Sequence, residues 1–101
     1  MTAITAQGSY TASSIATILT VTADSTVSIR ITNKSGGSGT ITEISRSAGT
    51  TTDVTGFLLG DIAIADNKTI EITGIVLSPT HDNLLLTCDV DLNYVISGAP
   101  Q

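Results

Sequence analysis

Apolar and polar side chains alternate strictly along the stretch Thr26-Val27-Ser28-Ile29-Arg30-Ile31-Thr32. Successive side chains of a β-strand point to opposite faces, so this pattern places the three apolar side chains on one face. Val and Ile are branched at Cβ and suit pleated strands better than helices. The stretch therefore predicts a strand with one face in a core and the other in contact with water.

The same two-residue period recurs along the chain, and no helical periodicity is sustained. It appears at Ile62–Ile64 and at Ile70–Ile72. The longest example runs from Leu84 to Ile96, where every second residue is apolar or aromatic. This run has the parity of one strand but the length of two, so it predicts either one long strand or a hairpin that turns near residues 89–91.

Two positions break the alternation. Ile41 and Ile44 have opposite parity within an expected strand at residues 40–46, which predicts a bulge or an edge position. Gly74 lies where the parity slips within an expected strand at residues 68–77, which predicts a bulge or a corner.

Glycine and polar residues separate the expected strands. The segment Asn33–Gly39 predicts a hairpin loop, and Val54–Ile64 predicts a strand that is interrupted at Gly60. Asn33 and Asn67 each begin an Asn-Lys-Ser/Thr triplet. We expect both in turns, because Asn tolerates the left-handed backbone region.

These segments amount to six to eight short strands at roughly 10-residue spacing. They predict an all-β fold, a single antiparallel β-sandwich of the jelly-roll-like or immunoglobulin-like kind. Residues 1–14 are weakly patterned, and we expect an N-terminal arm or an edge strand there. Residues 15–101 are expected to form the sandwich domain.

Composition and charge exclude several classes of function. The 101-residue chain is 41% hydrophobic but only 13% charged, and its net charge is -5. Four scattered cations (Arg30, Lys34, Arg46 and Lys68) are too few for a nucleic-acid partner, which needs about 6–10 positive groups. No run of 18 apolar residues occurs, so we expect no membrane partner.

Candidate catalytic and metal-binding residues are sparse. His81 and Cys88 are the only histidine and the only cysteine, and Cys88 lies on the apolar parity of its strand. Asp89 and Asp91 make a short acidic pair without the closely spaced oxygens of a calcium loop. We expect no catalytic residue, no bound metal and no cofactor, and hence no enzyme.

The order of segments resembles that of the small all-β virion proteins of tailed bacteriophages. The similarity is carried by Ile18–Thr26, by Ile31-Thr32-Asn33, by Ile62–Ile72 and by the step Gly74-Ile75-Val76-Leu77. It extends over about residues 15–97. The resemblance implies a structural role in a virion, on the capsid surface or on the tail, and it supplies no catalytic residues.

The leading hypothesis is a capsid decoration (cement) protein that binds the outer capsid surface. The expected partners are the major capsid protein or other virion proteins, and the expected location is the virion, assembled in the host cytoplasm. The 18 Thr and 11 Ser residues leave a polar surface of low charge, which favours self-association, expected as a trimer. Met1, Thr2, Ile4 and Tyr10 in the N-terminal arm are the expected docking residues.

Two alternatives stay open. A tail or fibre component, such as a receptor-binding head, would engage a host ligand through loops at 33–39 and 48–53. A small carbohydrate-binding β-sandwich module is disfavoured, because the chain has only three aromatic residues to stack on sugars.

Overall fold

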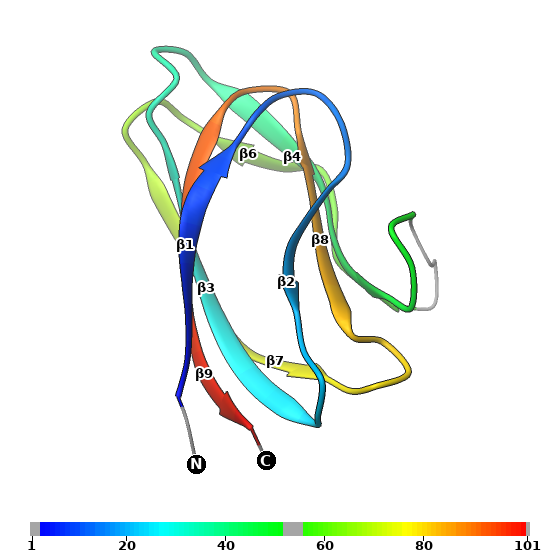
Figure 1. Ribbon diagram of the computed structural model, residues 1–101. Helices are drawn as coiled ribbons and strands as arrows, with labels where there is room; N and C mark the ends of the chain where they lie inside the picture. Colours follow the sequence, from blue (N-terminus) through cyan, green and yellow to red (C-terminus); the bar gives the residue numbers. More distant parts are fainter. Residues whose placement is uncertain (1–2, 52–55, 101) are drawn as a thin grey trace.

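In the part of the chain that the structure describes, alternating side chains give rise to nine β-strands, which the computed structural model arranges as two antiparallel sheets packed face to face (Figure 1). The structure describes residues 3–51 and 56–100. The strands are β1 (Ile4–Tyr10), β2 (Ala16–Thr20), β3 (Ser25–Asn33), β4 (Gly39–Ser47), β5 (Phe57–Leu59), β6 (Ile62–Ile64), β7 (Thr69–Leu77), β8 (Asn83–Cys88) and β9 (Leu92–Pro100). The predicted all-β antiparallel sandwich is confirmed.

The strand order identifies the kind of sandwich. Sheet A has the order β1-β9-β3-β7, and sheet B has the order β2-β8-β4-β5, with β6 also paired to β4. If β5 and β6 count as one interrupted strand, the first strand pairs with the last, the second with the last but one, and so inward. The chain is thus one long hairpin wrapped into two layers, which is jelly-roll topology rather than immunoglobulin-like topology.

Nine strands exceed the expected six to eight because two expected segments divide. Residues 54 and 55 lie outside the described residues, and the rest of the strand expected at 54–64 forms β5 and β6 on either side of Gly60 and Asp61. The run from Leu84 to Ile96 is also two strands, β8 in sheet B and β9 in sheet A. Three residues separate β8 from β9, so the inward parity is kept across the turn.

The loop at 33–39 is not the hairpin loop that the sequence predicts. It joins β3 in sheet A to β4 in sheet B, so it crosses from one layer to the other. The connections β1–β2, β2–β3, β6–β7, β7–β8 and β8–β9 cross in the same way. Polar, glycine-rich segments mark that a turn occurs, but they do not specify which strand the next one will pair with.

Asn33 and Asn67 have different roles, although both were expected in turns. Asn67 has a φ of 62°, in the left-handed region, as expected. Asn33 is the last residue of β3 and is fully buried. Its amide Nδ2 donates to the carbonyl oxygens of Gly37 at 2.8 Å and Ile64 at 2.9 Å, and its Oδ1 accepts from the backbone N–H of Ser35 at 2.9 Å. Asn33 therefore ties sheet A to sheet B at one end of the sandwich.

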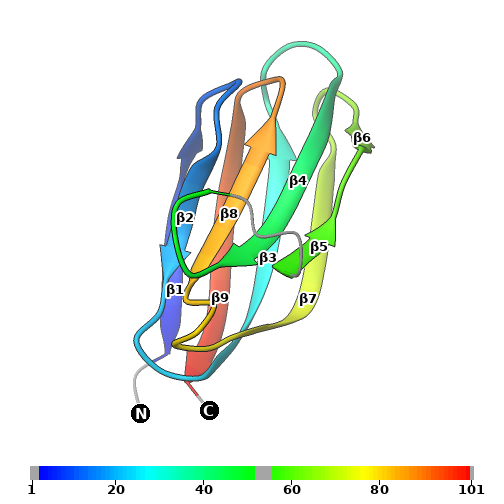
Figure 2. The same ribbon diagram turned by 90° about the vertical axis from the view of Figure 1, so that its right-hand side faces the viewer.

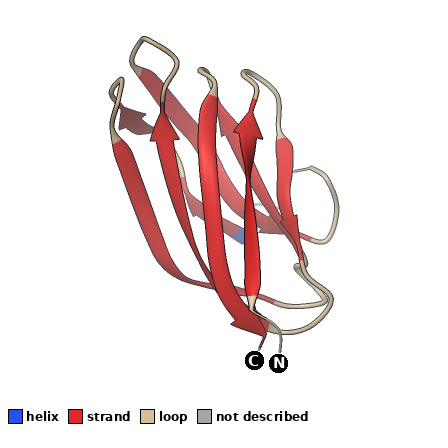
Figure 3. Ribbon diagram, turned by 60° about the vertical axis from the view of Figure 1, so that its left-hand side comes forward, coloured by secondary structure: helices blue, strands red, loops and turns tan. Residues whose placement is uncertain are grey.

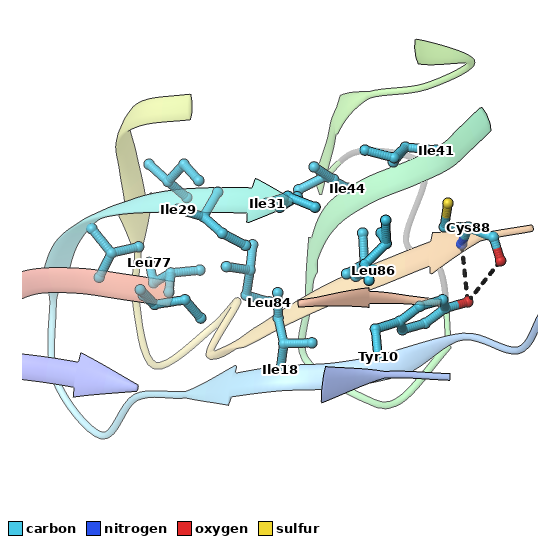
Figure 4. Close-up of a cluster of buried hydrophobic side chains, with 14 of the residues drawn as sticks. Tyr10, Ile18, Ile29, Ile31, Ile41, Ile44, Leu77, Leu84, Leu86 and Cys88 are labelled. Atoms are coloured by element: carbon cyan, nitrogen blue, oxygen red, sulfur yellow. Dashed lines mark hydrogen bonds between the residues drawn. The ribbon is translucent and has the colours of Figure 1, made fainter. Parts of the chain in front are cut away.

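The core lies between the two sheets, and the residues of inward parity fill it (Figure 4). Its fully buried members include Ile29, Ile31, Ile41, Ile44, Leu84, Leu86 and Ile96. Each such side chain contributes roughly 1.5–3 kcal/mol through removal from water. The parity predicted for β3 is confirmed.

Both predicted irregularities are bulges. The register between β4 and β8 shifts between Ile41 and Glu43, which lets Ile41 and Ile44 both face the core. β4 is not an edge strand, because it pairs with β8 on one side and with β5 and β6 on the other. In β7, Gly74 has a φ of 72° where the register with β3 shifts, a conformation that suits glycine.

Candidate functional site

Two of the four expected docking residues are described by the structure. Met1 and Thr2 lie outside the described residues. Ile4 and Tyr10 lie at opposite ends of β1, with their side chains on its inward face. Ile4 is half-buried, and Tyr10 is only 2% exposed. An N-terminal arm or an edge strand was expected at residues 1–14, and residues 4–10 form an edge strand. The expected contact of Tyr10 with a partner stays a prediction.

Tyr10 connects the two sheets at one end of the sandwich (Figure 4). Its hydroxyl oxygen accepts a hydrogen bond from the backbone N–H of Cys88 at 2.9 Å. The same hydroxyl lies 2.5 Å from the carbonyl oxygen of Ser14 and 3.1 Å from that of Cys88, so its single proton has an acceptor. Burial raises the pKa of the Tyr10 hydroxyl, so the side chain stays a neutral phenol to a higher pH than an exposed tyrosine does.

The substitution Tyr10→Phe tests this connection. It removes the acceptor of the Cys88 amide inside the core, and a buried unsatisfied donor costs about 1–3 kcal/mol. We expect the free energy of unfolding, measured by circular dichroism in urea, to fall by that amount. The control Tyr94→Phe changes a half-buried tyrosine on β9 and should cost about 0.5 kcal/mol or less. Equal effects of the two substitutions would contradict the role given to the Tyr10 hydroxyl.

His81 and Cys88 are not brought together. His81 lies in the turn before β8, where its backbone pairs with Ser78, and Cys88 ends β8. At about 3.3 Å per residue the two are roughly 20 Å apart. Burial raises the pKa of the Cys88 thiol, which keeps it in the less reactive protonated form.

The acidic residues near the β8–β9 turn hold backbone groups. Asp89 Oδ1 accepts from the backbone N–H of Thr40 at 2.7 Å, and Asp91 Oδ1 accepts from that of Ala12 at 2.9 Å. Within the described ranges, no group of three or more His, Cys, Asp and Glu side chains is placed to hold a metal ion. The carboxylates therefore stabilise the turn against its neighbouring segments.

The outer face of sheet A is formed by four adjacent strands (Figure 3). Its residues have the parity opposite to the core on four adjacent strands. They include Thr5, Gln7 and Ser9 of β1, Asn93, Val95 and Ser97 of β9, Ser28, Arg30 and Thr32 of β3, and Thr69 and Glu71 of β7. We call this set the hydroxyl face.

Charges on the hydroxyl face compensate each other. Arg30 and Glu71 form a salt bridge of 2.9 Å across β3 and β7, with side chains 63% and 50% exposed. Such an exposed pair contributes only about 0–1 kcal/mol to stability. Thr32 and Thr69 share a hydrogen bond of 2.8 Å next to it. The face is therefore polar, ordered and close to neutral, although the chain carries a net charge of -5.

An exposed apolar side chain lies within this polar surface. Val95 is 50% exposed and borders two shallow hollows of about 330 Å³ each. Gln7 lines both hollows, together with Thr5 and Ser97 in one and Ser9 and Asn93 in the other. An apolar centre with a polar rim is the usual anatomy of a protein-binding patch.

The outer face of sheet B is different, because residues 48–51, which follow β4, lie in front of it (Figure 2). Asn83 Nδ2 donates to the carbonyl oxygen of Gly49 at 2.8 Å, which fixes this segment to β8. Leu85 and Ser45 have outward parity yet are fully buried, and Glu43 is 8% exposed with its Oε2 2.6 Å from the Ser45 hydroxyl. Sheet B therefore presents less open strand surface than sheet A.

The hydroxyl face could be assigned from the sequence only strand by strand. Alternation indicates that Thr5, Ser28 and Val95 point outward, but the pairing of β1 with β9 and of β9 with β3 joins residues that are 59 or more positions apart. The excess of Thr and Ser was the one signal of a low-charge surface. The loop at 48–53, expected in a receptor-binding role, is described only through residue 51.

Among the residues that the structure describes, no helix could span a membrane. Comparison of the chain with protein-family models, with curated proteins and with solved structures found no match in any of the three.

Proposed function

We propose that the chain is a structural protein of a tailed-bacteriophage virion, a capsid decoration protein that binds the outer surface of the shell through the hydroxyl face. The observation that carries this proposal is the open, nearly neutral outer face of sheet A with Val95 exposed within it. The sequence resemblance supports the virion assignment. In this proposal the N-terminal region contributes to the contact through Thr5, Gln7 and Ser9 of β1, which belong to this face.

The chemistry of the face suits a protein surface. Desolvating Thr and Ser hydroxyls costs less than desolvating Lys or Asp, so the uncharged part of the face can lose its water at low cost. The exposed Val95 side chain adds a hydrophobic contribution at the contact. Arg30 lies opposite Val95 across β3 and β9, and its salt bridge to Glu71 leaves no net charge at this part of the face.

The size of the face matches a repeated contact of moderate strength. Three strands of nine residues and one of seven, spaced about 4.8 Å apart with about 3.3 Å per residue, cover roughly 540 Å². A standard interface takes about 800 Å² from each partner, so one such contact is modest. A symmetric shell offers the same contact many times, and coupling between neighbouring copies would raise the overall affinity.

Jelly-roll topology is compatible with this proposal but does not decide it. The fold occurs in viral capsid domains and in lectin domains alike, and function depends on the site rather than on the fold. The second candidate is a receptor-binding tail component. It is supported by a polar hollow of about 220 Å³ lined by Lys34, Asp91, Ser9 and Asn93, groups that could bind a hydroxyl-rich ligand.

The substitution Val95→Asp tests the proposed contact. It places a charge within the hydroxyl face without touching the core, so the protein should fold normally. We expect the variant to lose at least tenfold in binding to shells that lack the protein, measured by co-sedimentation. The substitution removes the apolar contact of Val95 and adds a charge that must lose its water at the interface, even with Arg30 opposite it across β3 and β9. The control Ala63→Asp adds the same charge at an exposed position of β6, in the other sheet, and should bind as the original chain does.

Copy number separates the two candidates. Quantitative mass spectrometry of virions should find hundreds of copies of a decoration protein and about a dozen or fewer copies of a tail protein. Equal binding of Val95→Asp and Ala63→Asp would contradict the role of the hydroxyl face. Failure of the unaltered chain to bind shells, together with a low copy number, would favour the tail.

A further inference from the structure

The free edge of β1 is long, regular and without charge. β1 is the end strand of sheet A, where β9 is its one neighbour among the described strands. All seven residues of β1 pair with β9 in one uninterrupted register. Ile4–Tyr10 contains no charged residue and no proline. Charge, proline and bulges are the usual means by which proteins protect sheet edges from pairing.

The other edges have such protection. β7, the opposite end of sheet A, carries Glu71 and a bulge at Gly74. In sheet B, β2 is five residues long with a register shift, and β5 and β6 are three residues each. Among the described strands, β1 is therefore the edge best suited to receive another strand.

The direction of the free backbone groups follows from the ladder. Asn33 exchanges backbone hydrogen bonds with Lys68 and Asn67 on the β7 side. Backbone groups alternate direction along a strand, so Thr32 and every second residue before it point to β9. The same alternation can be followed through the register of β9 with β3 and of β1 with β9. It places the backbone N–H and C=O groups of Ile4, Ala6, Gly8 and Tyr10 on the side of β1 that pairs with β9.

The N–H and C=O groups of Thr5, Gln7 and Ser9 therefore point away from the sheet. They have no backbone partner within residues 3–51 and 56–100. These three residues are also members of the hydroxyl face, with exposed side chains. The edge thus offers six backbone groups in a row that another antiparallel strand could pair with.

We propose that β1 pairs with β1 of a second copy of this chain, antiparallel and centred on Gln7. In this register Gln7 lies opposite the same residue of the second copy, and Thr5 lies opposite Ser9. Amide faces amide and hydroxyl faces hydroxyl, so the strand is complementary to itself. The six free backbone groups of each copy are then satisfied in one ladder.

The absence of charge on β1 makes this edge the part of the chain that a second copy can approach. Two chains of net charge -5 repel each other, so a stable contact between copies needs a segment without acidic residues. Ile4–Tyr10 meets this requirement over its whole length. On the inward side, half-buried Ile4 and Ala6 would lie opposite Tyr10 and Gly8 of the second copy and lose further contact with water.

The contact is isologous, so it closes at two copies. Its seven residues extend about 23 Å at 3.3 Å each, which makes a small interface. We expect a dimer that dissociates on dilution. Composition alone favoured a trimer. The two assemblies can be told apart by mass, because a dimer has twice and a trimer three times the chain mass of 10.3 kDa.

Light scattering on the purified full chain tests the pairing. The mass should rise from that of one chain near 1 μM to twice that value near 100 μM, following mass action. Gln7→Lys places two positive charges face to face at the centre of the ladder and should keep the protein monomeric at both concentrations. Ala63→Lys adds the same charge on β6 and should leave the dimer unchanged.

Disulfide trapping tests the register. Facing residues in such a pair have Cα atoms about 5.5 Å apart, within the range that a disulfide bridges. Oxidised Gln7→Cys protein should form a covalent dimer at least tenfold faster than Ala63→Cys, and buried Cys88 should not contribute. A monomer at 100 μM, a trimer, or equal rates for the two cysteine variants would each overturn the proposal.

Discussion

Replacing Ile29 with Asp is expected to unfold the protein, whereas replacing Ser28 with Asp is expected to leave it folded. The two residues are neighbours on β3, but Ile29 is fully buried between the sheets and Ser28 lies on the hydroxyl face. Circular dichroism and the urea midpoint of each variant measure the difference. The comparison isolates the side of the strand, because the introduced group is the same.

The magnitude follows from two losses at Ile29. Removing a buried Ile costs about 2–5 kcal/mol, and the new carboxyl group has no partner inside the core. The sum exceeds about 4–5 kcal/mol, which is comparable to the whole stability of a domain of this size. Ser28 borders a hollow lined by Arg30 and Glu71, so an added carboxylate there stays hydrated, close to both members of that salt bridge. Equal loss of structure in both variants would show that the side-chain directions assigned to β3 are wrong.

Local alternation predicted the strands and their inward faces because it depends only on neighbours in sequence. The run Val27, Ile29, Ile31 is buried as expected, and the opposite parity of Ile41 and Ile44 did mark a bulge. Both results follow from the two-residue period of a strand, which is the same wherever the strand pairs.

Pairing partners were not predictable in this way. β1 lies beside β9 and β2 beside β8, so the ladder that holds each strand comes from the far end of the chain. The continuous parity from Leu84 to Ile96 even concealed a change of sheet, because the turn between β8 and β9 preserves it. Both the hydroxyl face and the free edge of β1 depend on this long-range order, and neither is visible in any one segment.

Buried polar residues are the second kind of feature that local patterns missed. Asn33 begins a polar, glycine-rich segment, and such segments are typical of exposed turns. The burial of Asn33 depends on Ile64 in the opposite sheet, because the carbonyl oxygen of Ile64 accepts a hydrogen bond from the Asn33 amide. Tyr10 is similar, since the backbone of Cys88 is what makes its position in the core favourable.

Asn33→Asp should therefore destabilise the protein by about 3 kcal/mol or more at neutral pH, although the side chain keeps its shape. The carbonyl oxygens of Gly37 and Ile64 would lose a donor and face a carboxylate instead. Each buried group left without a partner costs about 1–3 kcal/mol, and the charge adds a desolvation penalty. Urea unfolding followed by circular dichroism measures the loss.

The pH dependence of the same variant separates this mechanism from a general loss of packing. Burial beside two carbonyl oxygens raises the pKa of the introduced carboxyl group in the folded protein above its unfolded value of about 3.9. A group with a raised folded pKa contributes most stability below the unfolded pKa and loses it as the pH rises, so the variant should be least impaired near pH 4. A protonated carboxyl can also donate to one of the two carbonyls. Asn67→Asp is the matched control, since Asn67 is exposed and its Oδ1 accepts from Lys34, a contact that a carboxylate retains. The hydrogen bond that it loses, from Nδ2 to Asp66 Oδ2 at 3.3 Å, is exposed to water. A loss at Asn33 that is independent of pH, or as small as that at Asn67, would mean that the donated hydrogen bonds of Asn33 do not hold the two sheets together at this end.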